Sequence, residues 1–488
     1  MNNRITETCL IACCLFFGGA VRAQAPAPAP VQKLWPTVSE VLTKAQIPLE
    51  SVSVVVKEVG ATDATVSLNA EKAMNPASVI KLVTTYAGLE LLGPAYAWKT
   101  EVLVAGKIER GTLTGDLVLK GTGDPKLSVE RFWMLLRQLR ERGLDTINGD
   151  LVLDRSFFES APHDPARFDG EPLRAYNVGP DPLLLNFKTV RFHFSPSVDD
   201  KSVSISPDVR PAQLDIVNRV KLNDGPCGEW RERVVADIQT PSATKLKLTF
   251  TGNYSRRCGE KTWNISLLDH ARFIGGVFAN LWRSAGGAWN GAVRIAPAPT
   301  DARLIATLES PSLAEVIRDI NKYSNNVMAR QLFLTLSAEL NRQPGNSTDS
   351  AQLIRDWLAR KGIAAPELIL ENGSGLSRGE RISAATLAQL LEAAWKSSVM
   401  PELMSSLSLV GVDGTLRKRG KTESIAGQAH IKTGTLNDVR AMAGYVLDAT
   451  GRRWIVVMMI NHPNALTTQA AQDALLNAVY ASAGTSIR

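Results

Sequence analysis

The secondary-structure pattern of the sequence changes twice along the chain, and these changes limit the folds that it can adopt. Residues 98–300 contain many short apolar and β-branched runs, which predict strands, whereas helix and strand patterns alternate before and after them. An antiparallel sheet with helices on both faces would require the N-terminal hairpin to pair beside the three C-terminal strands. We therefore expect the first and last parts to form one domain of the α/β (α+β) class, with β-rich units inserted into it.

The individual elements follow from hydrophobic periodicity and turn residues. In the outer parts the predicted helices are 37–45, one from Ser78 to a Gly-Pro stop at 93–94, 313–321, 326–340, 350–361, 384–396 and 466–481, and the predicted strands are 51–57, 64–69, 429–435, 440–448 and 453–460. In the central part the predicted strands are 100–105, 112–120, 149–154, 190–195, 202–206, 246–251 and 263–267, and the predicted helices are 129–142 and 270–285.

The N-terminus carries the features of an export signal. Arg4, an apolar run over residues 9–20 and a small-residue cleavage site ending at Ala23 predict a signal peptide over residues 1–23. Alternating Ala and Pro then predict an extended tether over residues 24–34. We expect a periplasmic protein whose α/β domain comprises residues 35–96 and 301–488. The inserted residues 97–300 are expected to form two subdomains, one nested in the other.

The charge balance bears on the partners of the protein. The 488 residues include 55 Lys and Arg against 48 Asp and Glu, a formal net charge of +7. The basic residues are spread along the chain, and the export signal excludes nucleic acid as a partner, so an anionic envelope polymer fits better. No apolar segment after the signal reaches membrane-spanning length, so at most a peripheral membrane contact is expected.

Cysteine and histidine usage argues against a metal site. Three of the five cysteines lie in the predicted signal, which leaves Cys227 and Cys258. In an exported chain such a pair predicts a disulfide, with two free buried thiols as the alternative. The five histidines lack ligand spacing, so we expect neither a metal nor another cofactor.

The first motif with chemical meaning is S-x-x-K at Ser78 and Lys81. Asn75 is a good helix N-cap and Pro76 suits the first helical position, so the two side chains should meet on one face of a helix. An amine with a lowered pKa can take the hydroxyl proton, which makes Ser78 a candidate nucleophile. The same spacing from Ser242 lies in a strand-like run and is interpreted as a solvated edge.

Two later motifs add polar groups of the same kind. Ser324 and Asn326 supply a hydroxyl and an amide between two predicted helices. Lys432, Thr433, Gly434 and Thr435 follow on a predicted strand, where a glycine permits close backbone approach and a strand edge can bind an extended peptide.

The order S-x-x-K, S-x-N, K-T-G resembles the active-site set of penicillin-binding proteins and serine β-lactamases. The first two motifs are 246 residues apart and the last two 108, so the insertion lies between the first two. This spacing resembles the class C low-molecular-mass penicillin-binding proteins, the D-alanyl-D-alanine carboxypeptidase/endopeptidases. Further stretches with this resemblance are GTGDP at 121–125, YNVGPD at 176–181, NGSGLSR at 372–378 and GVDGTLR at 411–417.

The resemblance implies a role for each motif residue. Lys81 would be the acylation base for Ser78, Ser324 and Lys432 would relay the proton to the leaving D-alanine, and Asn326 would hold the substrate amide. Thr433, Gly434 and Thr435 would bind the substrate backbone and carboxylate. The expected partners are peptidoglycan stem peptides ending in D-Ala-D-Ala, D,D-cross-links and β-lactam antibiotics, with penicillin bound covalently.

Two charged residues complete the expected site. By resemblance, Arg378 and Asp154 would recognise the free zwitterionic end of a diaminopimelate side chain. The alternative is that both are ordinary surface charges in loops.

Two rival functions are weighed against peptidase activity. A serine β-lactamase of class A would carry a Glu-x-x-Leu-Asn element between the second and third motifs, and none occurs there. A non-catalytic peptidoglycan-binding or penicillin-sensing protein would be favoured by loss of a catalytic residue, and none is lost.

Overall fold

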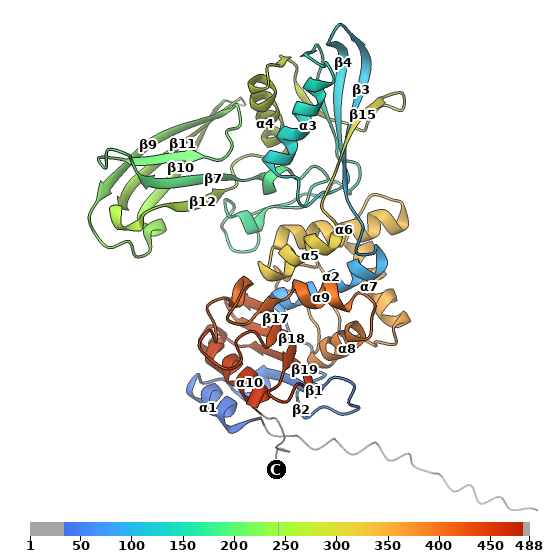
Figure 1. The fold of residues 1–488 in the computed structure, drawn as a ribbon, viewed down its shortest axis with the longest axis vertical. Helices are drawn as coiled ribbons and strands as arrows, with labels where there is room; N and C mark the ends of the chain where they lie inside the picture. The colour runs from blue at the N-terminus through green and yellow to red at the C-terminus, as the bar shows by residue number, and fades with distance from the viewer. Residues whose placement is uncertain (1–33, 243, 482–488) are drawn as a thin grey trace, which may run out of the picture.

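The structure is a computed structural model that describes residues 34–242 and 244–481. The predicted signal peptide and nearly all of the predicted tether lie outside these residues. Figure 1 shows two parts, with residues 99–309 in the upper part and the described residues before and after them together in the lower part.

The lower part is built around one six-stranded sheet. Its strands run in the order β16 (Ser408–Leu409), β17 (Ala429–Leu436), β18 (Val439–Leu447), β19 (Arg453–Asn461), β1 (Val52–Glu58) and β2 (Val66–Leu68). Every neighbouring pair is antiparallel. The N-terminal hairpin pairs beside the C-terminal strands, which confirms the prediction that both ends of the chain form one sheet.

Helices cover both faces of this sheet because its central strands are apolar on both sides. Along β19, Ile455, Val457 and Met459 point into one core, whereas Val456 and Met458 point into the other. The second core is closed by α1 (Pro36–Lys44) and α10 (Gln469–Ala481). The first core is closed by α2 (Lys81–Leu91), α5 (Leu313–Lys322), α6 (Asn326–Asn341), α7 (Ser347–Arg360), α8 (Ala384–Trp395) and α9 (Met400–Ser406).

The upper part contains a seven-stranded sheet and two three-stranded sheets. The larger sheet consists of β3 (Lys99–Glu109), β4 (Thr112–Gly121), β5 (Thr146–Ile147), β6 (Leu151–Asp154), β13 (Ala288–Trp289), β14 (Val293–Ile295) and β15 (Arg303–Glu309), and α3 (Val129–Glu141) and α4 (His270–Ser284) contribute to the same core. The smaller sheets are β12-β7-β8 (Lys261–Ile265, Val190–Pro196 and Val203–Pro207) and β10-β11-β9 (Val234–Ser242, Lys245–Ser255 and Leu214–Asn223).

The chain enters and leaves this upper part at adjacent points. Trp98 donates its backbone N–H to Ser310 Oγ at 2.9 Å, and β15 pairs with β3. The chain therefore returns to the lower part after Glu309, which is later than the predicted boundary between residues 300 and 301. The predicted division of the insertion into two nested subdomains stays a prediction.

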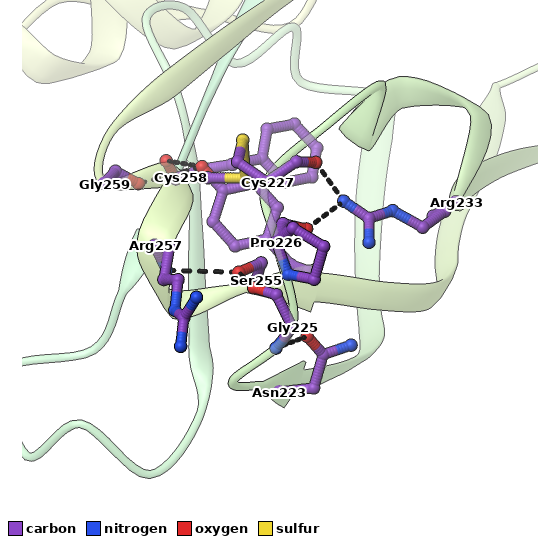
Figure 2. The surroundings of a disulfide bond; sticks show 11 residues. Asn223, Gly225, Pro226, Cys227, Arg233, Ser255, Arg257, Cys258 and Gly259 are labelled. Carbon is purple, nitrogen blue, oxygen red and sulfur yellow. Dashed lines mark hydrogen bonds between the residues drawn. A yellow bond between two sulfur atoms is a disulfide. The ribbon is translucent and has the colours of Figure 1, made fainter.

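A disulfide joins Cys227 to Cys258 within the insertion, with their Cα atoms 4.8 Å apart. The disulfide joins the loop before β10 to the chain just after β11 (Figure 2). Within that loop, Arg233 donates to the carbonyl oxygens of Pro226 and Cys227. The predicted disulfide is confirmed.

Buried hydrogen bonds connect the insertion to the helices around Ser324. Gln331 on α6 donates to the carbonyl oxygens of Gly123 at 2.9 Å and Asp181 at 2.8 Å, and it accepts from the Asp181 N–H. Lys126 pairs with Asp319 on α5 at 2.5 Å. The insertion thereby fixes both helices that flank the second motif. Over residues 34–242 and 244–481, none of the helices combines the length and apolar character needed to cross a bilayer.

Candidate active site

The turn that carries Ser78 differs from the predicted helix start. The segment Ala77–Ile80 is a 3-10 helix that leads into α2, and Pro76 holds the N-cap position predicted for Asn75. The Asn75 side chain instead accepts from the Ala77 N–H at 2.8 Å and donates to the Ser377 carbonyl at 3.0 Å. Ala77 has a φ of 45°, a backbone conformation that non-glycine residues adopt at a cost. The turn is therefore held by side-chain hydrogen bonds rather than by regular helix geometry.

Lys81 contacts three oxygen atoms from a fully buried position. Its Nζ lies 2.9 Å from Ser78 Oγ, 2.7 Å from Asn326 Oδ1, and against the Ser374 carbonyl oxygen. The amide and carbonyl oxygens can only accept, so they take the two N–H groups of a neutral amine. The amine lone pair then faces the Ser78 hydroxyl and can receive its proton.

Electrostatics favour this neutral amine. Burial lowers the pKa of Lys81 well below its ordinary value, and the positive charge of Lys432 lowers it further. The carboxylate of Glu380 acts in the opposite direction. A neutral lysine beside a serine hydroxyl is the arrangement that a lysine general base requires.

The second and third motifs meet through Lys432, which is also fully buried. Its Nζ lies 2.9 Å from Ser324 Oγ and 2.7 Å from the Thr433 carbonyl oxygen, and burial lowers its pKa to about 7. Ser324 has a φ of 56° in the bend between α5 and α6, where Asn325 caps α6 by accepting from the Met328 N–H. The structure thus brings together all three motifs predicted from the sequence.

Strand β17 passes directly beside the nucleophile turn. A Cβ atom on Gly434 would lie 2.5 Å from the Pro76 carbonyl oxygen and 3.0 Å from the Ser78 nitrogen, so a side chain there would displace the turn. Strand β16 pairs only with His430 and Ile431. Beyond that pair, the edge of β17 facing away from β18 carries no strand among the described residues, which leaves it free for an extended peptide.

The loop that carries Arg378 also completes the surroundings of Lys81, a role that the sequence did not predict. Gly375 has a φ of 80°, and a Cβ atom there would lie 2.0 Å from the Ala77 carbonyl oxygen. The fully buried Glu380 accepts from the backbone N–H groups of Glu371, Asn372 and Gly373, which orders the approach to Ser374. The NGSGLSR stretch drew attention to this loop, but a backbone carbonyl acting on Lys81 leaves no side-chain pattern.

A model of the D-Ala-D-Ala carboxypeptidase 3 (S13) family matches residues 34–479. The chain belongs to this family. It is 26% identical to D-alanyl-D-alanine carboxypeptidase DacB of Haemophilus influenzae over 415 aligned residues, and this alignment covers 84% of this chain and 85% of that protein. It is 28% identical over 417 residues to the D-alanyl-D-alanine carboxypeptidase of Actinomadura sp. (strain R39), which covers 82% and 76%.

Solved structures agree with this assignment. The crystal structure of penicillin binding protein 4 (dacB) from Haemophilus influenzae superposes with a TM-score of 0.74 at 25% identity, covering 91% of this chain and 99% of that one. The Bd0816 predatory endopeptidase of Bdellovibrio bacteriovorus has the same fold, with a TM-score of 0.51 at 15% identity. The protein is therefore a serine-type peptidase of the D-Ala-D-Ala carboxypeptidase family, with the fold of penicillin-recognising peptidases, as predicted from its motifs.

The two charged residues assigned to a side-chain pocket lie in different surroundings. Arg378 is exposed, pairs with Asp438 at 2.8 Å and stacks over the Phe168 ring at 4.8 Å from its centre. Asp154 is buried at the end of β6, where it accepts from the Ser156 N–H and hydroxyl and from the Ala298 N–H. These contacts connect Arg378 to the insertion and give Asp154 a local structural role.

Proposed function

We propose that this S13 peptidase is a periplasmic D-Ala-D-Ala carboxypeptidase and D,D-endopeptidase that cleaves peptidoglycan stem peptides through an acyl-enzyme on Ser78. The observation that carries the proposal is the contact set of Lys81, a fully buried amine between the Ser78 hydroxyl and two oxygens that can only accept. Of these three partners, the Ser78 hydroxyl is the one with a proton to give to the amine.

In the acylation step, the Ser78 hydroxyl gives its proton to Lys81 as its oxygen attacks the carbonyl carbon of the penultimate D-alanine. The backbone N–H groups of Ser78 and Thr435 stabilise the resulting oxyanion, an effect typically worth about 3 kcal/mol per donor. A proton then passes through Lys432 and Ser324 to the leaving amine, and the C–N bond breaks. Their separation of 2.9 Å supports this relay.

The acyl-enzyme is an ester, which water hydrolyses to release the shortened peptide and restore the Ser78 hydroxyl. In the proposed binding mode the peptide lies along the free edge of β17. Asn326 holds the substrate amide, and the hydroxyls of Thr433 and Thr435 hold the carboxylate next to the scissile bond. A D,D-cross-link has a carboxylate in the same position, so one site serves both reactions.

The same chemistry accounts for β-lactam binding. A β-lactam ring resembles acyl-D-alanyl-D-alanine, and its nitrogen stays tethered to the acyl group after ring opening, so it cannot diffuse away as D-alanine does. The Haemophilus influenzae relative has been solved complexed with a β-lactam. We propose that this protein forms a long-lived acyl adduct on Ser78 with penicillin.

We also propose that Arg378, with Asp154, recognises a free diaminopimelate side-chain end. The exposure of Arg378 and its contact with Phe168 of the insertion support its part, because a ligand carboxylate could take the place of Asp438 as its ion-pair partner. Asp154 has less support, since its carboxylate oxygens already accept three hydrogen bonds. Arg378→Ala should lower kcat/KM about ten-fold on diaminopimelate peptides and hardly affect peptides without that end. An equal loss on both would refute the pocket, and the same comparison with Asp154→Asn tests the second residue separately.

The direct test of the proposed function is release of D-alanine from a D-Ala-D-Ala peptide by purified protein. Ser78→Ala should abolish release, while Ser242→Ala, which alters the other S-x-x-K sequence, should leave it unchanged. Ser242 ends β10 in the insertion and is exposed, so it is a matched control. Release that persists in Ser78→Ala would contradict the assignment of the nucleophile. The release of no D-alanine by the wild type, together with rapid turnover of penicillin, would favour a β-lactamase instead.

A further inference from the structure

A buried carboxylate lies behind the loop that contacts Lys81. Glu380 is fully buried, and one of its oxygens accepts from the backbone N–H of Gly373 at 3.0 Å. The next residue, Ser374, presents its carbonyl oxygen to Lys81. The other carboxylate oxygen of Glu380 is buried and has no hydrogen-bond partner among the described residues. Hydrogen bonds therefore neutralise the negative charge only in part, and in a buried site such a charge acts strongly on its neighbours.

A buried arginine approaches Lys81 from a different element. Arg330 follows Asn326 by four residues on α6, so both side chains lie on the same face of that helix. Asn326 is itself a direct partner of Lys81. The Arg330 side chain is 8% exposed, and it donates to the Val178 carbonyl oxygen at 3.3 Å. Its Nε has no hydrogen-bond partner within residues 34–242 and 244–481. A positive charge shielded from water thus lies one helical turn from a residue that contacts the base.

The two charges act on Lys81 in opposite directions. Burial is the largest cause that lowers the pKa of Lys81, followed by the charge of Lys432; Glu380 raises this pKa and Arg330 lowers it. Burial lowers the pKa of Arg330 to about 10, so the guanidinium stays charged near neutral pH. The charged groups that face Lys81 are therefore Arg330 on α6, Glu380 on the loop after Ser374, and Lys432 on β17.

A general base benefits from such a balance. Lys81 must be neutral before it takes the Ser78 proton, and it must then hold that proton strongly enough to remove it from a hydroxyl. A nearby positive charge favours the first condition, and a nearby negative charge favours the second. One charge of each sign keeps the amine between these limits.

We propose that Glu380 and Arg330 are positioning residues for the general base, two opposing buried charges that together set how strongly Lys81 holds the proton it takes from Ser78. The inference rests on the proposed acyl-enzyme function and deepens it, because it names the groups that regulate the base. Neither residue touches the reacting atoms, so both act through Lys81.

The test is the pH dependence of Ser78 acylation by benzylpenicillin, followed by mass spectrometry of rapidly quenched samples. The rate should rise with pH as Lys81 loses its proton, and the midpoint of this rise reports how strongly the amine holds it. Glu380→Gln keeps an oxygen for the loop N–H groups and removes the negative charge, so the midpoint should move to lower pH by about one unit. Arg330→Met removes the positive charge and should move it to higher pH by about one unit. The double variant Glu380→Gln/Arg330→Met should return close to the wild-type midpoint.

Two control variants separate charge from packing. Glu371→Gln removes an exposed carboxylate from the same loop and should keep the wild-type midpoint. Arg330→Lys keeps the positive charge on α6 and should also stay near the wild-type midpoint, in contrast to Arg330→Met. If Glu380→Gln does not fold, this contrast between the two Arg330 variants still decides whether the charge is used.

Several results would overturn the inference. Single variants whose midpoints stay unchanged or move in the same direction would show that the two charges do not oppose each other at Lys81. A lower rate at high pH with an unchanged midpoint would mean that the residues only support the loop and α6. A double variant displaced as far as either single variant would contradict the balance. The absence of an adduct on Ser78 in the wild type is a different result, because it contradicts the proposed function itself.

Discussion

Replacing Lys432 with methionine should stabilise the protein near neutral pH while abolishing its activity. Lys432 is fully buried, and its surroundings lower its pKa to about 7. A protonated lysine at this position therefore costs folding free energy. Methionine has a similar length and no charge, so Lys432→Met removes that cost while largely filling the same space.

The size and pH dependence of the effect follow from linkage. Lowering a lysine pKa from 10.5 to about 7 corresponds to about 4 to 5 kcal/mol of unfavourable free energy at low pH. The lost hydrogen bonds to Ser324 and to the Thr433 carbonyl offset about 1 kcal/mol each. We expect Lys432→Met to be more stable than wild type by about 2 to 3 kcal/mol at pH about 6.

The sign of the pH dependence is also fixed. Between pH about 7 and about 10.5 the unfolded chain binds a proton at Lys432 that the folded chain does not, so wild-type stability rises with pH by about 1.4 kcal/mol per pH unit. The methionine variant lacks this contribution. Its advantage should therefore be constant below pH about 7, shrink above it, and reverse by pH about 9.

Urea unfolding, followed by circular dichroism at several pH values, measures this difference. Lys418→Met, in an exposed loop, is the matched control and should show no pH-dependent difference from wild type. A Lys432→Met protein that is less stable than wild type at pH about 6, or a difference that does not change with pH, would refute the reasoning.

Two further predictions concern the disulfide and the loop beside the nucleophile. Replacing Cys227 and Cys258 with serine should lower the unfolding free energy of the insertion by about 3 to 4 kcal/mol and leave penicillin labelling of Ser78 intact. Two alkylatable thiols in exported wild-type protein would contradict the disulfide. Gly375→Ala should slow acylation by penicillin about ten-fold or more, because the new Cβ atom would lie 2.0 Å from the Ala77 carbonyl oxygen; an unchanged acylation rate would show that the turn tolerates displacement.

The fold of the lower part could be predicted because its signals are local and strong. The runs that form β1, β18 and β19 are mostly apolar on both faces, with their charged residues near the strand ends, and such strands require a sheet covered on both faces. In the insertion, β9 and β10 were not predicted, although β9 largely alternates apolar residues with polar and charged ones, as a half-exposed strand does. The very short strands β5, β13 and β14 are too brief to leave a pattern.

The candidate site could be predicted as far as its side chains form motifs. Ser78, Lys81, Ser324, Asn326 and Lys432 were identified by spacing and order, and the structure brings them within hydrogen-bond distance in pairs. Contacts that involve the backbone or residues outside a motif could not be predicted in this way.

Three such contacts illustrate the limit. The Ser374 carbonyl completes the surroundings of Lys81 but depends on the folded path of a loop. Glu380 acts on three backbone N–H groups. Arg330 meets the Val178 carbonyl oxygen only where α6 packs against the insertion. Each follows from the tertiary structure and leaves no sequence signal of its own.

The central claim is that Ser78 is the nucleophile and Lys81 its base, and one measurement tests it most directly. Purified protein is treated with benzylpenicillin, digested and mapped by mass spectrometry. The adduct is expected on the peptide that contains Ser78, and it should be absent from Ser78→Ala and form far more slowly in Lys81→Met. An adduct on any other serine, or labelling that survives Ser78→Ala, would contradict the assignment.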